Sequence, residues 1–226
     1  MSYFVTGTDT GVGKTLVSCA LLYALAQQGK RVVGFKPVAA GCDDDDHNDD
    51  AKHLRVASNV QAAYGQINPY CFPHAIAPHL AARHAGARID FARIMASYRE
   101  LAAQADEVIV EGVGGFCVPL NEKQDSADLA KQLDLPVILV VGMRLGCLNH
   151  ALLSMRVIAD YQLECAGWVA NVMASEMPAL QENIDALRDR ITAPLLGVIP
   201  YQTQADAQAA ATYLDLSLLE KKEIDG

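Results

Sequence analysis

The stretch Tyr3-Phe-Val-Thr-Gly-Thr-Asp-Thr-Gly-Val-Gly-Lys-Thr15 decides the fold of this chain of 226 residues. Its first apolar residues predict a buried strand, and a helical apolar pattern begins after Gly13-Lys14-Thr15. A strand, a glycine-rich loop, Gly-Lys-Thr and a helix together form the context of a phosphate-binding loop, or P-loop. Backbone amides and the helix dipole can bind phosphate oxygens there, while Lys14 can reach the β- and γ-phosphates and Thr15 can ligate Mg²⁺.

The match departs from the strict pattern Gly-x-x-x-x-Gly-Lys-Ser/Thr at one position. Thr8 stands where the pattern has glycine, and the nearest glycines are Gly7 and Gly11. A glycine-rich turn that arose by chance is the alternative interpretation, but the strand, the loop and the helix all agree with a nucleotide site. We therefore expect a nucleoside triphosphate to contact the segment Gly11-Val12-Gly13-Lys14-Thr15-Leu16.

The composition excludes several classes of partner. The formal net charge of −9 argues against non-specific binding to nucleic acid or to anionic membranes. The N-terminus enters the first strand at once, so we expect no signal peptide, and no apolar run approaches the length of a membrane span. The six cysteines show no Cys-x-x-Cys spacing, so reduced thiols and a cytoplasmic location are expected.

Apolar strands and helices alternate along the whole chain. Strands are predicted at about 3–7, 31–36, 107–111, 136–142, 166–171 and 194–199. Helices are predicted at about 14–28, 78–85, 91–105, 126–133, 150–161, 179–191 and 214–219, with an irregular segment at 60–76. Because the strands are continuous apolar runs, both faces of the sheet should be buried. The sequence predicts an α/β fold, with a mostly parallel central sheet and helices on both faces, in one domain of residues 1–226.

A second chemical signal follows the strand at 107–111. Glu111 ends this apolar run, and Gly112, Val113 and Gly114 come directly after it. An acid at the carboxyl end of a buried strand is the Walker-B arrangement, which holds Mg²⁺ directly or through water. The glycines allow the backbone to approach a ligand closely.

Lys36 and a pair of aspartates extend this group. Lys36 lies near the carboxyl end of the second strand, where open α/β sheets bind their ligands. It is either an ordinary surface lysine or a cation that faces the phosphates, and the residues alone do not separate the two. The loop at 39–50 is acidic and expected to be solvated, but Asp49 and Asp50 stand at the start of a predicted helix.

Two further positions stand at element ends. Asn171 is expected at the end of the fifth strand of the sheet. The helix predicted at about 150–161 offers a second anion site at its N-terminus, which Asn149 could cap. A capped helix without any ligand is the alternative.

Stretches spread over nearly the whole chain resemble the dethiobiotin synthetase family, which belongs to the P-loop NTPases. They are Thr6-Gly-Thr-Asp-Thr10, Val12-Gly-Lys-Thr15, Lys36-Pro-Val38, Asn68-Pro-Tyr70, Pro78-His79, Val110-Glu-Gly112, Gly114-Gly115, Leu145-Gly-Cys147, Asn149-His150, Gly167-Trp-Val-Ala-Asn171, Pro194-Leu-Leu-Gly197 and Ile199-Pro200. The family carries threonine at the first P-loop position, which accounts for Thr8.

The resemblance implies ATP-dependent closure of a cyclic urea. The substrate 7,8-diaminononanoate takes up CO₂ as a carbamate, and ATP phosphorylates the carbamate to a mixed anhydride. The second amine then attacks, which gives dethiobiotin, ADP and phosphate in biotin biosynthesis. ATP and Mg²⁺ are the cofactors implied, and a homodimer with sites at the subunit interface is the assembly implied.

The resemblance also assigns residues. It implies catalytic roles for Lys14 and Lys36, Mg²⁺ ligation by Thr15, Asp50 and Glu111, nucleotide contacts also at Gly112, Val113, Gly114, Asn171, Val172, Pro200, Tyr201 and Gln202, and substrate contacts at Thr10, Lys36, Ala40, Gly146, Cys147 and Asn149. Residues 146–149 would hold the substrate carboxylate of the partner subunit. Ala40 stands where many relatives have a hydroxyl, and either Asp49 or Asp50 could face the metal.

Two other classes of protein remain as alternatives. A MinD-type or partitioning ATPase switch would usually carry a second lysine early in the P-loop, where this chain has Thr6-Gly-Thr8. A small-molecule kinase would typically need a lid with several arginines. Neither class consumes bicarbonate, so a requirement for bicarbonate separates both from the synthetase.

Overall fold

The computed structural model describes residues 2–43, 45 and 47–219. Its main sheet has six strands in the order β2-β5-β1-β6-β7-β8, and all neighbours are parallel. The strands are β1 (Tyr3–Gly7), β2 (Val32–Phe35), β5 (Glu107–Glu111), β6 (Val137–Met143), β7 (Cys165–Val172) and β8 (Leu195–Ile199). The predicted parallel sheet is confirmed, because each of these strands lies in a segment where an apolar run was found.

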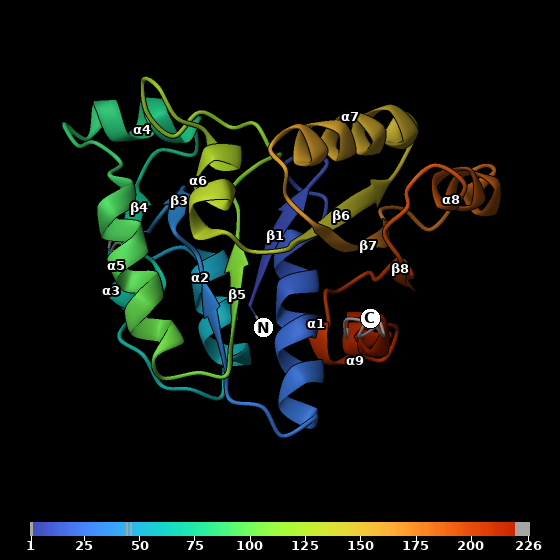
Figure 1. Cartoon of the computed structure of the whole chain (residues 1–226), viewed down its shortest axis with the longest axis horizontal. Coiled ribbons are helices and arrows are strands. Elements are labelled where there is room, and N and C mark those ends of the chain that lie inside the picture. Colours follow the sequence, from blue (N-terminus) through green and yellow to red (C-terminus); the bar gives the residue numbers. More distant parts are fainter. Residues whose placement is uncertain (1, 44, 46, 220–226) are drawn as a thin grey trace, which may run out of the picture.

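Helices cover both faces of this sheet (Figure 1). One face is covered by α1 (Lys14–Gln27), α2 (Asp49–Ala57) and α9 (Ala207–Ala211). The other is covered by α5 (Phe91–Ala102), α6 (Ser126–Leu133), α7 (Cys147–Asp160) and α8 (Leu180–Arg188). Successive strand residues point to opposite faces, so Phe4 packs in the cluster with α5 and α6, while Val5 packs in the cluster with α1.

The prediction of an irregular segment at 60–76 is partly wrong. It contains α3 (Tyr64–Ile67) and β4 (Tyr70–Phe72), and β4 pairs in parallel with β3 (Val38–Ala40) in a second small sheet. Elements of three or four residues are too short to show a period in the sequence. Pro78–His84 forms α4 as expected, whereas the tail forms α9 and a 3₁₀ turn at Leu216–Leu219 instead of one helix.

Cys42 and Cys71 form a disulfide, so the expectation of six reduced thiols is wrong for this pair. Strand β4 places Cys71 opposite Ala39, and the backbone N–H groups of Gly41 and Cys42 both donate to the carbonyl of Phe72. The Cα atoms of the two cysteines are 6.0 Å apart, within bonding range. Only the β3–β4 pairing, which the sequence did not reveal, brings them together. The described free cysteines are Cys19, Cys117, Cys147 and Cys165.

The strands present their carboxyl ends at one edge of the sheet. Because β2, β5 and β1 are neighbours, Lys36, Glu111 and the P-loop that follows Gly7 lie side by side at that edge. In open α/β sheets this is the edge that binds ligands. Within the described part of the chain, no helix is both long and apolar enough to cross a membrane.

Candidate functional site

The P-loop curls around the N-terminus of α1, and its glycines are required by its shape. Gly13 has φ +88°, and a Cβ there would lie 2.2 Å from the amide nitrogen of Asn171. No other residue fits this position. Thr8 is not among the residues with positive φ, and its N–H donates to the carbonyl of Val140. Threonine at this position therefore costs the loop no strain.

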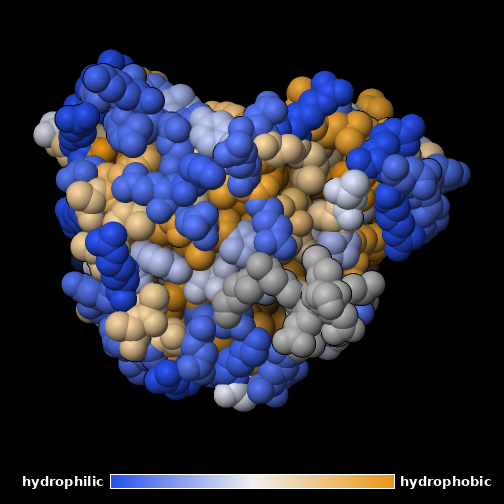
Figure 2. Space-filling view, viewed as in Figure 1, coloured by the Kyte–Doolittle hydropathy of each residue, from blue (hydrophilic) through white to orange (hydrophobic). Residues whose placement is uncertain are grey.

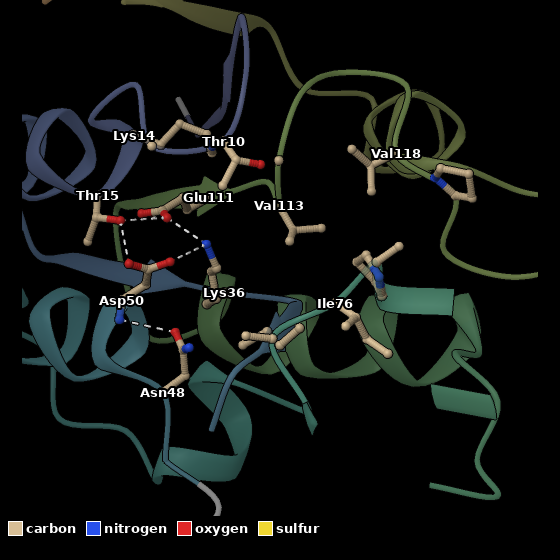
Figure 3. A pocket seen from close by; sticks show the side chains of 18 of the residues that line it. Thr10, Lys14, Thr15, Lys36, Asn48, Asp50, Ile76, Glu111, Val113 and Val118 are labelled. Carbon is tan, nitrogen blue, oxygen red and sulfur yellow. Dashed lines mark hydrogen bonds and ion pairs between the residues drawn. The ribbon is translucent and has the colours of Figure 1, made fainter. Parts of the chain in front are cut away.

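Four side chains from different elements converge at the start of α1 (Figure 3). The Thr15 hydroxyl oxygen lies 2.8 Å from Asp50 Oδ1 and 2.9 Å from Glu111 Oε1. Lys36 Nζ donates to Asp50 Oδ2 at 2.9 Å, to Glu111 Oε1 at 2.6 Å and to the Gly112 carbonyl at 3.2 Å. Lys36 is therefore not an ordinary surface lysine: only 2% of it is exposed, and its ammonium lies between two carboxylates.

The charged groups of this cluster shift one another's pKa values. Burial alone would lower the pKa of Lys36, but the charges of Glu111 and Asp50 and their hydrogen bonds outweigh it and raise that pKa above its usual value. Burial alone would raise the pKa of Asp50, but the charge of Lys36 and the bonds from Lys36 and Thr15 hold that pKa below its usual range. Both groups are charged at neutral pH.

Lys14 adds a second buried ammonium beside the first. Its Nζ donates to the carbonyl of Asp9 at 2.8 Å. Burial, followed by the charge of Lys36, lowers the pKa of Lys14 to about 8. Two lysines so close to each other favour anions, because each is stabilised when negative charge arrives between them.

The ligand set of this cluster fits Mg²⁺. A hydroxyl has one proton, so Thr15 can donate to only one of its two carboxylates at a time. Glu111 Oε2 is buried and has no hydrogen-bond partner among the described residues, which leaves a lone pair for a cation. No group of three or more His, Cys, Asp or Glu suited to a metal occurs among the described residues. A hydroxyl and two carboxylates suit Mg²⁺, which keeps several of its waters.

The structure separates the two candidate aspartates. Asn48 caps α2, and its side chain accepts the N–H of Asp50. Asp50 then points toward Thr15 and Lys36, whereas the side chain of Asp49 is 85% exposed and pairs with Lys52. Of the neighbouring acidic run, Asp44 and Asp46 lie outside the described residues.

The cluster forms one end of a cavity of about 850 Å³. Predicted residues that line it include Thr10, Gly11, Gly13, Lys14, Thr15, Lys36, Ala40, Asp50, Glu111, Val113 and Gly114. Away from the charged end the lining becomes apolar, and the view in Figure 3 places Ile76, Val113 and Val118 there. Sequence reasoning missed Ile76 and Val118, because neither residue stands in a recognised motif.

A second hollow of about 760 Å³ lies on the other side of the P-loop. Thr15, Leu16 and Asp50 line it together with the segment 204–208. That segment is held by Gln202, whose side chain accepts the N–H of Asp206 at 2.8 Å and donates to its carbonyl at 3.2 Å. The role of 204–208 was not predicted, because the loop has no motif and only tertiary structure brings it to α1.

The remaining predicted nucleotide residues lie at the end of β7 and directly after β8. Asn171 lies near the end of β7 just before Val172, and its Nδ2 donates to the P-loop carbonyl of Val12 at 2.9 Å. Pro200, Tyr201 and Gln202 come directly after β8. Neither Asn171 nor 200–202 lines either of the two hollows described.

The start of α7 lies apart from both hollows. Gly146 is the N-cap, with φ +93° and no side-chain cap bond, so the expected cap by Asn149 is wrong. A residue with positive φ was needed to turn the chain into the helix, and glycine provides it. The thiol of Cys147 is buried, and Asn149 is exposed one turn into the helix.

Comparisons with known proteins agree on one family. The family described as an AAA domain matches residues 1–209. A protein of Aromatoleum aromaticum named ATP-dependent dethiobiotin synthetase BioD is 53% identical over 215 residues, which cover 93% of this chain and 96% of that protein. A protein of the same name from Nitrosospira multiformis is 52% identical, and 95% of each chain is covered.

Solved structures show the same fold at low identity. The MinD cell division protein of Aquifex aeolicus is 16% identical with a TM-score of 0.53, and the match covers 93% of this chain and 86% of that one. A ParA family ATPase of Chlorobium tepidum is 15% identical with a TM-score of 0.53, and the match covers 93% and 89%. At this identity the likeness is one of fold alone.

Proposed function

This chain belongs to the ATP-dependent dethiobiotin synthetase family, and we propose that the cluster around Lys36 is where its diamine substrate is carboxylated, phosphorylated and closed. It is an ATP-dependent ligase that forms dethiobiotin in biotin biosynthesis. The chain is 53% identical to one of these synthetases and 16% identical to MinD, so a partitioning switch is not needed to explain the P-loop.

Lys36 carries the proposal. One amine of 7,8-diaminononanoate attacks CO₂ and releases a proton, which leaves a carbamate anion. A carbamate oxygen attacks the γ-phosphorus of ATP, and ADP leaves. The second amine then attacks the carbamoyl carbon and releases a proton, the ring closes, and phosphate leaves with the electron pair of the broken bond. Negative charge gathers on the carbamate and the transferred phosphoryl group, and a lysine fixed beforehand between elements of the site stabilises it.

The shape of the larger cavity supports this substrate. Its charged end suits the carbamate, and its apolar arm suits the alkyl chain that joins the amines to the carboxylate. We place Thr10 and Ala40 beside the diamine, because both line the cavity. Ala40 offers only a methyl group, so the contact that a hydroxyl makes in many relatives is absent or made by water.

ATP would lie along the P-loop. Residues 11–16 hold its phosphates, Lys14 leaves the carbonyl of Asp9 to meet them, and Gly112–Gly114 approach from β5. The nucleoside half extends toward Asn171, Val172 and the segment 200–202. Since Val12 holds Nδ2 of Asn171, the amide oxygen of that residue remains as an acceptor for the amino group of adenine. Leu16 and residues 204–208 would border the ribose.

We propose that Thr15, Asp50 and Glu111 hold Mg²⁺, which when bound neutralises phosphate charge. The free lone pairs of Glu111 Oε2 support this. With a cation on Asp50 and Glu111, the ammonium of Lys36 would be available to the carbamate. The low pKa of Asp50 keeps that carboxylate ionised and able to ligate.

A homodimer explains the position of the remaining substrate residues. Gly146, Cys147 and Asn149 open α7 away from the cavity, and with a buried thiol Cys147 can offer only its backbone. Leu145 beside them is fully exposed, at 101%, and Leu153 on α7 is 51% exposed. Such a surface favours contact with a second copy, whose substrate carboxylate would meet this helix start. We propose that each subunit is one domain and that it acts in the cytoplasm, where ATP is made available.

The experiment is an assay of ADP release with the diamine, run with and without bicarbonate. We expect release only when diamine, bicarbonate and ATP are all present, with dethiobiotin detected by mass. Release that is independent of bicarbonate would instead indicate a kinase, and release that is independent of diamine would indicate an ATPase switch.

A further inference from the structure

The segment Asn68-Pro69-Tyr70, singled out in the sequence, has so far no role in the site. Asn68 is buried, with 4% exposed, between α3 and β4. Its Nδ2 donates to the carbonyl of Lys36 at 2.7 Å and to the carbonyl of Tyr70 at 3.0 Å. The N–H of Lys36 donates to the carbonyl of Ile67 at 2.8 Å. The backbone of Lys36 is therefore held on both sides by residues that precede β4.

The orientation of Asn68 links it to a tyrosine. Both protons of its Nδ2 are used, so the atom that faces Tyr64 is the carbonyl oxygen Oδ1, 3.4 Å from the hydroxyl. That hydroxyl accepts the N–H of Asn48 at 2.7 Å, and its own proton faces two acceptors, Asn68 Oδ1 at 3.4 Å and the carbonyl of Asn48 at 3.5 Å. Burial raises the pKa of Tyr64, so the proton stays on the hydroxyl at neutral pH. The ring packs edge-on against His47, with centroids 4.1 Å apart.

Asn48 continues the chain of bonds to the metal ligand. Its side chain accepts the N–H of Asp50 at 3.1 Å, and the carboxylate of Asp50 meets Lys36 Nζ at 2.9 Å. The bonds thus form a closed ring: Lys36 carbonyl, Asn68, Tyr64, Asn48, Asp50, and Lys36 ammonium. Figure 3 shows the Asn48–Asp50–Lys36 part of this ring.

We propose that Tyr64 and Asn68 are positioning residues for the reaction. They hold the backbone of Lys36 and the N-terminus of α2 at a fixed distance from each other. The inference rests on the roles proposed above for Lys36 and Asp50. In that reaction both side chains would change partners, since Asp50 would help to hold Mg²⁺ and Lys36 would meet the carbamate. If the two backbones are fixed, only the side chains move, and the charges stay preorganised. A displacement of about 1 Å in such a site costs about a hundredfold in rate.

Tyr64→Phe is the first test, because it removes the hydroxyl and keeps the ring against His47. We expect kcat to fall about tenfold, the effect of one lost hydrogen bond, and the Mg²⁺ concentration for half-maximal rate to rise several-fold. The KM for the diamine should stay within about twofold, since neither residue lines the cavity. Mg²⁺-dependent binding of a fluorescent ATP analogue, measured without turnover, should show the same rise.

Tyr70→Phe is the matched control. The hydroxyl of Tyr70 accepts the backbone N–H of Asp90, which is the N-cap of α5. In the same way, the hydroxyl of Tyr64 accepts the backbone N–H of Asn48, which is the N-cap of α2. The chemistry removed is the same, but α5 carries no residue of the site. We expect an equal change in melting temperature for the two variants, but loss of kcat and of Mg²⁺ affinity only in Tyr64→Phe.

Asn68→Ala is the second variant, because it removes the Nδ2 donor to the Lys36 carbonyl and the Oδ1 acceptor that faces Tyr64. It should lose more activity than Tyr64→Phe, and the double variant should lose no more than Asn68→Ala alone, since one chain of bonds is broken in each. Additive losses, or equal losses in Tyr64→Phe and Tyr70→Phe, would overturn the proposal. If the wild type made no dethiobiotin, the proposed function would be wrong. The Mg²⁺-dependent binding of the ATP analogue would still show whether the ring positions Lys36 and Asp50.

Discussion

Lys36, with its buried ammonium group, is the residue on which the chemistry depends. It is charged in a place where a lone charge would be very costly, and the carboxylates of Glu111 and Asp50 offset that cost. The same arrangement keeps a cation ready beside the phosphate-binding loop. A lysine on the protein surface would be hydrated and mobile, and would stabilise a carbamate much less.

Lys36→Ala should lower turnover by about a hundredfold or more, since it removes a preorganised charge worth about 3 kcal/mol. Lys14→Ala should have an effect of similar size. The measurement is the rate of ADP release with saturating diamine and bicarbonate. Lys30→Ala is the matched control. Lys30 pairs with Glu107, the first residue of β5, whereas Lys36 pairs with Glu111, the last residue of the same strand. Near-normal turnover in Lys36→Ala would remove this residue from the mechanism.

Asp50→Asn should raise the Mg²⁺ concentration required for half-maximal rate by about tenfold, because one anionic ligand becomes neutral. Asp49→Asn is the control one residue away, and its exposed side chain predicts an unchanged requirement. Rate is measured as a function of free Mg²⁺ at fixed ATP. A larger shift in Asp49→Asn than in Asp50→Asn would reverse the assignment. Glu111→Gln should shift the titration in the same direction as Asp50→Asn.

At the scale of elements, the small sheet of β3 and β4 supports the loop that leads to α2. Its pairing brings Cys42, just after β3, within bonding range of Cys71 on β4 and ties the end of β3 to the segment before α4. The carbonyl of Gly41 accepts a bond from Asn48, so the support extends to the cap of the helix that carries Asp50. The elements around the site are thus fastened by contacts outside the main sheet.

Reduction of the Cys42–Cys71 bond should lower the free energy of unfolding by about 3 kcal/mol, because the bond closes a loop with a sequence separation of 29 residues. The measurement is urea unfolding of the oxidised protein and of Cys42→Ser. Cys117→Ser is the control, since this exposed thiol is free and its loss should change stability by only a few tenths of a kcal/mol. Equal stability of Cys42→Ser and the wild type would show that the cross-link contributes nothing.

At the scale of the molecule, the order of the strands assembles the site. Strands β2, β5 and β1 are adjacent although they are far apart in sequence, so three loops meet at one edge. The space-filling view in Figure 2 shows apolar surface in the region that α7 occupies in Figure 1. One edge of the sheet thus provides the chemistry, and α7 offers a surface for a second copy.

Leu145→Glu should convert the protein from twice the 24.3 kDa of one chain to a monomer, because a charge would be buried in the proposed interface. Light scattering after size exclusion gives the mass. Leu218→Glu is the control, since Leu218 is an exposed leucine far from α7 in sequence. A dimer that survives Leu145→Glu unchanged would place the interface elsewhere.

Mixed dimers test whether the partner completes the site. Lys36→Ala and Asn149→Ala variants are mixed after dissociation and allowed to reassociate. If Asn149 serves the site of the other subunit, one site in each mixed dimer is intact, and about a quarter of all sites should be active. Activity no higher than the sum of the two separate variants would mean that each subunit works alone.

Local signals in the chain were enough for the frame of the molecule. Continuous apolar runs predicted all six strands of the main sheet, and the glycines with Lys14 and Thr15 predicted the P-loop. Glu111 was found because an acid directly after an apolar run stands at a strand end whatever the strand's neighbours are. These signals depend on residues close together in sequence, where period and spacing carry the information.

Folding in three dimensions decided what depends on distant segments. Neither the choice of Asp50 over Asp49, nor the pairing of Cys42 with Cys71, nor the apolar arm at Ile76 and Val118 follows from any local pattern. The ring through Asn68 and Tyr64 is the clearest case, since the sequence marked Asn68 only within a stretch that resembles the family and did not mark Tyr64. Contacts between loops are fixed by the packing of the elements that carry them, and that packing is set by the whole chain at once.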